Sequence, residues 1–352
     1  MICTSPLIRA EYNTVYLNKQ GGLSYQTKFL DRDKWDKGEY NDQIGVNNLY
    51  RRIHPVPCGQ CINCQLNYSR DKATQMMLET SMYPEEEVWF CTWTYNDEHL
   101  PHYSTKYLLA DSNEWKTVTG ISLDKRNMQL MNKRKRWHYR HYNPHSVYCG
   151  EYGSKTNRPH AHSIEWGLPL NVARLEKFSI NEWGDPIWRC KELEEIWVDE
   201  NGNPLGNVMV GRVTWETCGY VARYTLKKAL GKTKEDYKKW YQMQGKRPEY
   251  IVWSNGIGKE YFLNNKDKIY QTDSVPIVNK KTGQVVKPPK YYDRIIEKID
   301  PELHKYITEK RQRQAENLNI LSRMSDTFSP EERRATSEAR MQSIMQDFRQ
   351  EV

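Results

Sequence analysis

The sequence predicts an α+β protein in which a central antiparallel β-sheet is flanked by helices. Residues 88–95 are rich in aromatic and β-branched side chains, which is typical of a buried strand. Residues 147–152 and 160–166 are two short apolar segments separated by turn-forming residues, and they predict an antiparallel hairpin. Residues 214–231 follow a helical pattern. Strands that precede a helix in this way indicate a sheet with a helix packed against it.

The chain divides into three regions by composition. Residues 1–70 are polar and turn-rich, and we expect an irregular segment there that contains a cysteine cluster. Residues 71–265 carry the strand and helix patterns of the main domain, although residues 168–212 read as a polar excursion. Residues 266–352 are charged, and from Tyr291 onward they contain no glycine and two prolines. This region is therefore predicted to be mostly helical.

Two further helices are expected in the main domain. Residues 68–82 follow an amphipathic pattern, and residues 123–142 form a basic segment. A charge run of this kind is usually a solvated face, and contact with phosphate is the alternative. The basic residues are Lys125, Arg126, Lys133, Arg134, Lys135, Arg136 and Arg140.

The composition favours a polyanionic partner and a protein that is soluble and intracellular. The net charge is +8, and aromatic residues make up 12% of the chain, with 24 Tyr, 12 Trp and 6 Phe. Tyr and Trp stack on exposed bases, so this balance suits single-stranded nucleic acid. No signal peptide and no apolar run of about 20 residues is evident, so no membrane partner is expected. The eight cysteines are then expected to be thiols or metal ligands.

The predicted hairpin carries a candidate metal site. His160 and His162 share one face of the second strand because side chains alternate along a strand. Glu151 lies on the first strand, close enough to complete a set of three ligands. Two imidazoles and a carboxylate leave positions open on an octahedral ion, which suits Mg²⁺ or Mn²⁺. Asp97 or Glu98 is the alternative third ligand, and a pair of ordinary core or surface histidines is the alternative to a metal site.

The helix over residues 214–231 is predicted to begin at Thr214 and to end near Gly231. On this helix Tyr220, Tyr224 and Lys227 fall in one narrow sector. The opposite side is a plausible core face, made by Trp215, Cys218, Ala222, Thr225, Leu226 and Ala229. A metal and a cation beside a phenol would favour its attack on phosphate, whereas packing against another element is the ordinary role of paired tyrosines.

The cysteines separate into two groups. Cys58, Cys61 and Cys64 have spacings compatible with a structural zinc site, and Cys3 is the preferred fourth ligand, with His54 as the alternative. Reduced thiols in a turn-rich segment would explain the same pattern without zinc. The other four fall on predicted strands or core faces and read as small packing residues: Cys91, Cys149, Cys190 and Cys218.

Ordered motifs over roughly residues 1–265 resemble the HUH-endonuclease replication initiators of microviruses, which are small single-stranded DNA bacteriophages, and most of all the gokushovirus branch. The motifs are the cysteine cluster followed by Tyr68-Ser69-Arg70, the run 92–101, the run 149–153 before the His-x-His pair, the Tyr-Val-Ala-Arg-Tyr helix, and the run 256–262. Two departures are Glu165, where an apolar residue is common, and Cys91 in the first strand. Both bear on local packing more than on chemistry.

The resemblance implies an HUH endonuclease fold and rolling-circle initiation. Such a protein would nick the viral plus strand at the origin, stay linked to the 5′ phosphate through Tyr220 or Tyr224, and rejoin the ends to release circular single-stranded DNA. Its partners would be single-stranded and duplex origin DNA, a host helicase and the host DNA polymerase, in the bacterial cytoplasm.

Two other functions fit parts of the sequence. A non-catalytic, zinc-dependent nucleic-acid-binding protein would use the cysteine cluster and give no role to Tyr220 or Tyr224. A metal-dependent nuclease that uses water would leave no protein on the DNA. A covalent adduct separates the first reading from both.

Overall fold

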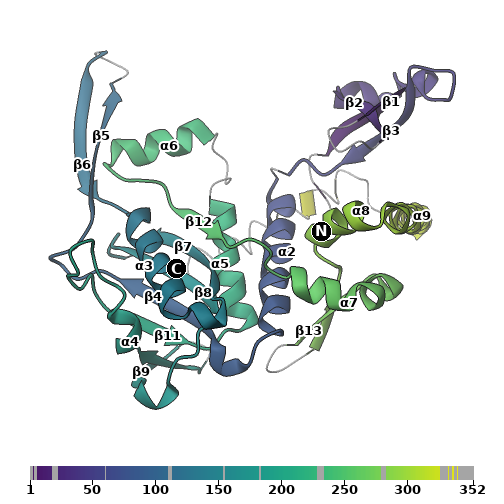
Figure 1. The fold of residues 1–352 in the computed structure, drawn as a ribbon. Helices are drawn as coiled ribbons and strands as arrows, with labels where there is room; N and C mark the ends of the chain where they lie inside the picture. Colours follow the sequence, from purple (N-terminus) through teal and green to yellow (C-terminus); the bar gives the residue numbers. More distant parts are fainter. Residues whose placement is uncertain are drawn as a thin grey trace. The chain divides into compact units, whose positions relative to one another are not determined.

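The computed structural model describes most of the chain, and its described residues fall into two compact units. One unit contains residues up to Asn67, and the other begins at Tyr68. The described residues are 3, 6–17, 23–59, 61–109, 113–153, 155–181, 184–227, 234–278, 283–325, 332, 335, 336 and 339. Figure 1 shows the course of the chain through both units.

The first unit is built on a three-stranded antiparallel sheet in the order β2-β1-β3. Its strands are β1 (Leu7–Leu17), β2 (Leu23–Leu30) and β3 (Tyr50–Val56), and the short helix α1 (Arg32–Asp36) follows β2. A small core of Ile8, Ala10, Tyr50 and Ile53 closes one face. The expectation that residues 1–70 are irregular is therefore wrong. Few positions in these strands are buried, so the alternation that marks a strand is weak in the sequence.

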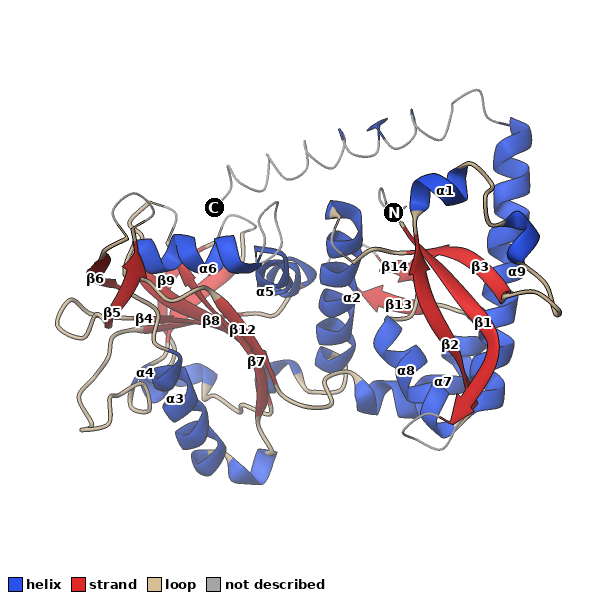
Figure 2. Ribbon diagram, turned by 90° about the horizontal axis from the view of Figure 1, so that it is seen from above, coloured by secondary structure: helices blue, strands red, loops and turns tan. Residues whose placement is uncertain are grey.

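The second unit contains a seven-stranded antiparallel sheet in the order β12-β7-β8-β4-β11-β10-β9. Its strands are β4 (Val88–Thr94), β7 (His145–Tyr152), β8 (Pro159–Trp166), β9 (Glu176–Ile180), β10 (Pro186–Arg189), β11 (Val208–Gly211) and β12 (Tyr250–Trp253). The predicted α+β class, the strand over 88–95 and the antiparallel hairpin β7–β8 are confirmed. Figure 2 shows the sheet between two layers of helices.

Three strands of this sheet arise from the region read as a polar excursion. β9, β10 and β11 extend the sheet beyond β4, and α4 (Lys191–Glu194) connects β10 to β11. Each of these strands has only four or five residues, and most of the residues in β9 and β10 are partly or fully exposed. Short strands of this kind carry too few alternating positions to be recognised from sequence.

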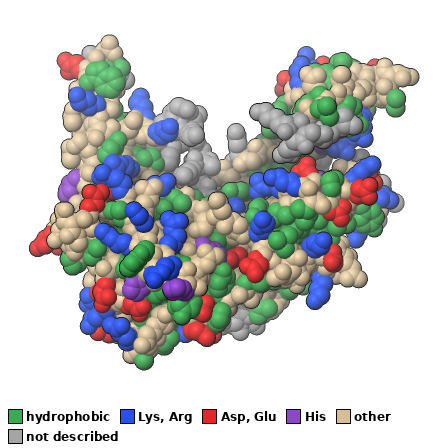
Figure 3. Space-filling view, viewed as in Figure 1, with side chains coloured by type: hydrophobic (Ala, Val, Ile, Leu, Met, Phe, Trp, Pro, Cys, Tyr) green, Lys and Arg blue, Asp and Glu red, His purple; other side chains and the backbone are tan. Residues whose placement is uncertain are grey.

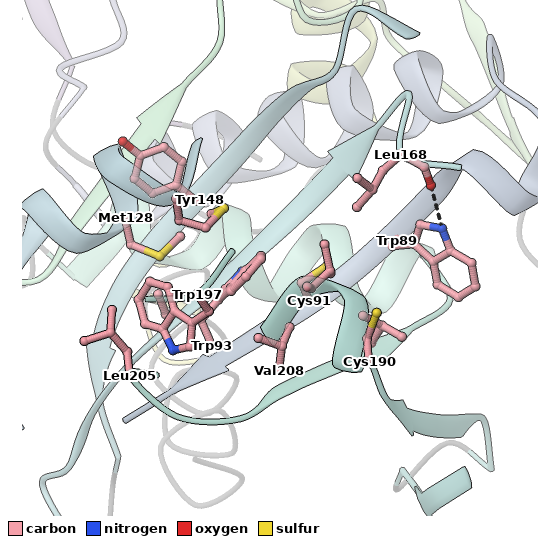
Figure 4. Packing of buried hydrophobic residues seen from close by; sticks show 14 of the residues in the cluster. Trp89, Cys91, Trp93, Met128, Tyr148, Leu168, Cys190, Trp197, Leu205 and Val208 are labelled. Atoms are coloured by element: carbon pink, nitrogen blue, oxygen red, sulfur yellow. Dashed lines mark hydrogen bonds between the residues drawn. The ribbon is translucent and has the colours of Figure 1, made fainter. Parts of the chain in front are cut away.

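One face of the sheet packs against α3 (Lys125–His138). Met128 and Met131 of this helix join a core with Trp89 and Trp93 of β4, part of which appears in Figure 4. Trp89 donates a hydrogen bond from its indole nitrogen to the carbonyl of Leu168 at 3.0 Å. The expected helix over 123–142 is thus confirmed, although its last residues form a 3-10 turn at Arg140–Tyr142.

The basic residues of α3 are not all on the surface. Figure 3 shows Lys and Arg side chains gathered over this helix. Lys135, however, is fully buried, and Arg134 donates hydrogen bonds to the carbonyls of Val198 and Asp199 at 2.5 and 2.7 Å. These two cations are therefore committed to the protein interior and to a loop.

The opposite face of the sheet packs against α2 (Ile62–Thr80) and α5 (Trp215–Lys227). Ala73 and Met76 of α2 share a core with Cys218 and Val221 of α5 and with strand residues such as Ile164. The helix α2 begins six residues before the predicted start at Tyr68. This is the face on which the side chains of His160 and His162 lie, because they alternate with Ala161, which belongs to the core under α3.

The remaining elements of the second unit are a hairpin and a helical layer. They are β5 (His102–Leu108), β6 (Trp115–Ile121), α6 (Lys234–Met243), α7 (Lys259–Thr272), β13 (Val275–Val278), β14 (Gly283–Val286), α8 (Lys290–Ile299) and α9 (Pro301–Ser325). A third core joins α7 and α8 to Leu78 of α2. The helical character expected after Tyr291 is confirmed up to Ser325. Among the described residues, no helix is both long and apolar enough to span a membrane.

Candidate active site

The register of the hairpin brings the predicted metal ligands together. Glu151 pairs directly with His160 across the two strands, and His162 pairs with Cys149. Cross-strand partners point to the same face, so one carboxylate and two imidazoles meet on the side covered by α5. Gly150 lies between two of these positions, and a Cβ atom there would come within 2.6 Å of the Tyr250 ring. The glycine therefore lets β12 lie close behind the site.

One oxygen atom is the focus of this arrangement. Oε1 of Glu151 lies 2.5 Å from Nε2 of His160 and 2.9 Å from Nε2 of His162. The hydroxyl of Tyr220 donates a hydrogen bond to the same oxygen at 2.7 Å. The other carboxylate oxygen, Oε2, is buried and has no hydrogen-bond partner among the described residues. A buried charged atom without a partner is costly, and such atoms often mark a position where an ion binds.

Neighbouring groups fix the two imidazole rings. Nδ1 of His160 donates to the carbonyl of Arg158 at 3.1 Å, so its Nε2 can carry the lone pair that a metal needs. Nδ1 of His162 lies 2.9 Å from the hydroxyl of Thr92, its cross-strand partner on β4. The ring of Phe90 stacks on His162 with an interplanar angle of 10°.

The charges at the site favour an ionised carboxylate and a protonated phenol. Burial acts to raise the pKa of Glu151, but the imidazoles of His162 and His160 outweigh it and hold that pKa well below its usual range. Burial raises the pKa of the Tyr220 phenol far above its usual value, and the adjacent Glu151 raises it further. The guanidinium of Arg223 lies 5.4 Å from the centre of the Tyr220 ring and acts in the opposite direction.

The helix α5 presents Tyr220 to the hairpin. It begins as predicted at Thr214, whose hydroxyl accepts a hydrogen bond from the Thr217 amide, while the Thr217 hydroxyl accepts one from the Thr214 amide. A cavity of about 110 Å³ lies beside Tyr220 and is lined by Phe90, His162, Thr217 and Tyr220. Tyr224 and Lys227 belong to α5, but their side chains lie outside the described part of the structure, as does the predicted helix end at Gly231.

The alternative third ligands lie elsewhere. Asp97 forms an ion pair with Arg158 at 2.5 Å, and its side chain is 88% exposed. Glu98 is exposed as well. The group that the structure brings within metal-binding distance is Glu151, His160 and His162, whose ligand atoms all lie within 4.8 Å of one another. These donors, together with the unpartnered Oε2 of Glu151, fit a divalent cation such as Mg²⁺ or Mn²⁺.

The cysteine cluster assembles in the first unit. The Sγ atoms of Cys3, Cys58, Cys61 and Cys64 lie within 4.8 Å of one another, and His54 instead contacts Arg52. Sγ of Cys3 lies 3.5 Å from that of Cys58 and 3.7 Å from that of Cys61. Burial raises the pKa of Cys64 to about 12. The other four cysteines are buried packing residues, as predicted.

Some residues of the site were not found from the sequence. Phe90 and Thr92 share the histidine face of β4, and their alternation with Cys91 and Trp93 could have indicated it. Arg223 escaped notice because it lies outside the sector of Tyr220 on the helix. Glu165, noted only as an unusual residue, lies on the opposite face of the sheet and forms an ion pair with the buried Lys135.

Comparison with known proteins places this site in a family. A sequence model of the family of replication-associated proteins of the ORF2 type matches residues 88–229. The chain is 33% identical to the replication-associated protein ORF2 of Spiroplasma virus 4 over 285 residues, which is 77% of each chain. The chain belongs to the family of microvirus replication-associated proteins.

Other members of this family are similar over most of the chain. The replication-associated protein VP4 of Bdellovibrio phage phiMH2K is 30% identical over 70% of this chain and 69% of its own. The replication-associated protein ORF4 of Chlamydia phage 1 is 26% identical over 76% of this chain and 60% of its own. No solved structure matches. The segment 88–229 shared with the family model runs from β4 to the end of α5, so it contains Glu151, His160, His162 and Tyr220.

Proposed function

We propose that this microvirus replication-associated protein initiates rolling-circle replication by nicking the viral plus strand at the origin with a tyrosine, in the manner of HUH endonucleases. The observation that carries the proposal is the convergence of His160, His162 and the Tyr220 hydroxyl on one oxygen of Glu151. A nucleophile and a set of cation ligands are thereby held at the same point. The similarity to phage replication-associated proteins supports the same biological setting.

The proposed reaction is a transesterification. The phenolic oxygen of Tyr220 forms a bond to the phosphorus, and the bond from phosphorus to the 3′ oxygen breaks. The 3′-OH leaves with a proton, and the 5′ phosphate remains on the tyrosine. The number of phosphoester bonds is unchanged, so the reverse reaction can rejoin the ends without ATP. The free 3′-OH would prime a host polymerase, and a host helicase would separate the strands.

Each residue of the site has a definite part in this reaction. Glu151 accepts the hydrogen bond from Tyr220 and so fixes the position of the phenolic oxygen. Arg158 and Thr92 orient the two imidazoles. A divalent cation, Mg²⁺ or Mn²⁺, held by Glu151, His160 and His162 would neutralise phosphate charge and favour the phenolate. We assign Tyr224 as a second nucleophile on the same helix, and Lys227 as a cation that stabilises the attacking phenolate.

The proposal is tested by incubating the protein with labelled single-stranded origin DNA and Mn²⁺ and by looking for a DNA-shifted protein band on a denaturing gel. Tyr220→Phe or Tyr224→Phe alone should leave some single-round cleavage, whereas the double variant should form no adduct. Tyr148→Phe is the matched control, because Tyr148 is a buried tyrosine of the core under α3. An adduct in the double variant would reject the assignment. Cleavage without any adduct would favour a hydrolytic nuclease.

The imidazoles give a second test. His160→Ala and His162→Ala should each abolish cleavage and leave DNA binding largely intact, because the basic surface supplies the phosphate contacts. His138→Ala, at an exposed position of α3, is the control. Full cleavage by both of the site variants would count against a catalytic cation.

We also propose that the four cysteines of the first unit hold one structural zinc ion. Four thiolates around one point are the typical ligand set of such a site. Purified, reduced protein should contain about one equivalent of zinc, and a chelator should lower its melting temperature. Folded protein without zinc would reject the site. If zinc is present and no adduct forms, the non-catalytic nucleic-acid-binding function is preferred.

A further inference from the structure

A basic pocket in the second unit lies outside the candidate active site. It has a volume of about 670 Å³ and is formed by α2, α7 and α8, which are neighbours in Figure 1. Four cations line it: Lys72 of α2, Lys259 of α7, and Arg294 and Lys298 of α8. Its other lining residues are Tyr291 and aliphatic side chains of α7 and α8, and it contains no carboxylate. The pocket thus combines positive charge with an apolar and aromatic surface.

The cations of this pocket have no carboxylate to neutralise them. Within the described part of the chain, none of the four forms an ion pair. Lys72 donates a hydrogen bond to Oε1 of Gln75 at 3.2 Å, and its ammonium lies 4.4 Å from the centre of the Trp253 ring. The guanidinium of Arg294 lies 6.0 Å from the centre of the Tyr291 ring.

The environment of Lys72 indicates that this clustering is unfavourable without an anion. Burial lowers the pKa of Lys72, and the charge of Arg294 lowers it further, while Asp71 acts in the opposite direction. Like charges that crowd one pocket are relieved by a ligand that carries several negative charges.

We propose that this pocket binds the backbone of single-stranded DNA and gives the strand an anchor apart from the active site. The four cations would contact successive phosphates, and the Tyr291 ring and the aliphatic surface would pack against unpaired bases. Grooves that bind single strands combine positive charge with aromatic rings in this way, whereas a duplex hides its bases. The proposal rests on the proposed function only in taking DNA as the polyanion.

The test compares two variants that each lose two lysines. Lys259→Gln/Lys298→Gln removes charge from the pocket, and Lys268→Gln/Lys305→Gln removes the same charge from exposed positions of α7 and α9. Binding of a fluorescent oligothymidylate is measured by anisotropy at several salt concentrations, without added Mg²⁺ or Mn²⁺. The pocket variant should bind on the order of tenfold more weakly, with a salt slope smaller by about 1.4, whereas the control should match the wild type.

A third variant tests the base contact. Tyr291→Leu should weaken binding of the oligothymidylate by about fivefold or more and leave binding of a blunt duplex unchanged. Circular dichroism melting of every variant checks that the fold is intact.

Equal losses in the pocket and control variants, or wild-type binding by the pocket variant, would overturn the proposal. So would a loss confined to duplex DNA. The oligothymidylate contains no origin, so this outcome does not depend on nicking. A protein that never nicks but loses strand binding in the pocket variant would reject the proposed function and leave this inference standing.

Discussion

Glu151 and Glu165 lie on neighbouring strands of one sheet, and both are buried, yet they face opposite sides and have different partners. Glu165 forms an ion pair with Lys135, and both side chains are fully buried. Nζ of Lys135 also donates to Oδ1 of Asn132 at 2.8 Å, and that oxygen accepts the Ser146 hydroxyl at 3.1 Å. The charge on this face is therefore neutralised by a cation that belongs to the protein.

Glu151 has no such cation among its partners. Its hydrogen-bonding neighbours are two imidazoles and a phenol, and one of its oxygens has no partner among the described residues. The comparison separates a carboxylate that holds the sheet to α3 from one whose surroundings leave room for an external cation. Burial alone does not distinguish the two, whereas the nature of the partner does.

The largest effect on stability should come from breaking the pair on the α3 face. Lys135→Met leaves Glu165 buried without its cation, and we expect the free energy of unfolding to fall by about 3–5 kcal/mol. Urea denaturation measures the loss. The double variant Lys135→Met/Glu165→Leu removes both charges and should recover much of the stability. A cost below about 1 kcal/mol for the single variant would show that the pair is not what holds this face.

Glu151→Gln should have the opposite profile. The amide keeps the shape of the side chain and an acceptor for Tyr220, so we expect unfolding to change by less than about 1.5 kcal/mol. Loss of a charged ligand should lower Mn²⁺ affinity by at least about 100-fold, since even residues that only orient ligands contribute roughly 10- to 100-fold. Titration calorimetry with Mn²⁺ gives the affinity, and Glu165→Gln is the matched control. Unchanged Mn²⁺ binding would remove the distinction between the two glutamates.

A third buried glutamate, Glu79, sharpens the comparison because its partner titrates. Nε2 of His145 lies 2.5 Å from Oε1 of Glu79, and the other oxygen accepts the Gly258 amide at 2.6 Å. Burial acts to lower the pKa of His145, but the contact with Glu79 outweighs it and the pKa is raised.

The raised pKa predicts the sign of the pH dependence, which should be the smallest of the three effects. The charged imidazole contributes stability that is fully present below its unfolded pKa, near about 6.5. This contribution is lost as the pH rises through the higher pKa of the folded state. The free energy of unfolding of the wild type should decline across that window, and that of His145→Gln should not. Parallel profiles for the two proteins would contradict the assignment.

The sequence predicted those parts of the site that depend on local periodicity. His160, His162 and Glu151 follow from the alternation of a hairpin, and their convergence is what the register produces. Cys3 was joined to the other cysteines across more than fifty residues because it was the remaining cysteine of that region. Lys135 was read as part of a solvated charge run, since nothing within α3 reveals a carboxylate thirty residues away on β8.

Other features depend on contacts that the sequence does not encode locally. The strands β9 to β11 are short and become recognisable only through their pairing with β4. Thr92 acts on His162 across two strands that lie seventy residues apart. Such residues require the register of the whole sheet, whereas periodicity describes one element at a time.

The order of strands has a consequence for synthesis of the protein. The hairpin β7–β8 lies inside the sheet, paired with β4 on one side and with β12 on the other. β4 is made before the hairpin, but β12 spans Tyr250–Trp253, about a hundred residues after Glu151. A ribosome adds roughly 5–20 residues per second, so β7 waits several seconds or more with its outer edge unpaired. During that interval the nascent chain offers an open strand edge to whatever lies nearby, and the edge closes only when Tyr250–Trp253 has emerged from the ribosome.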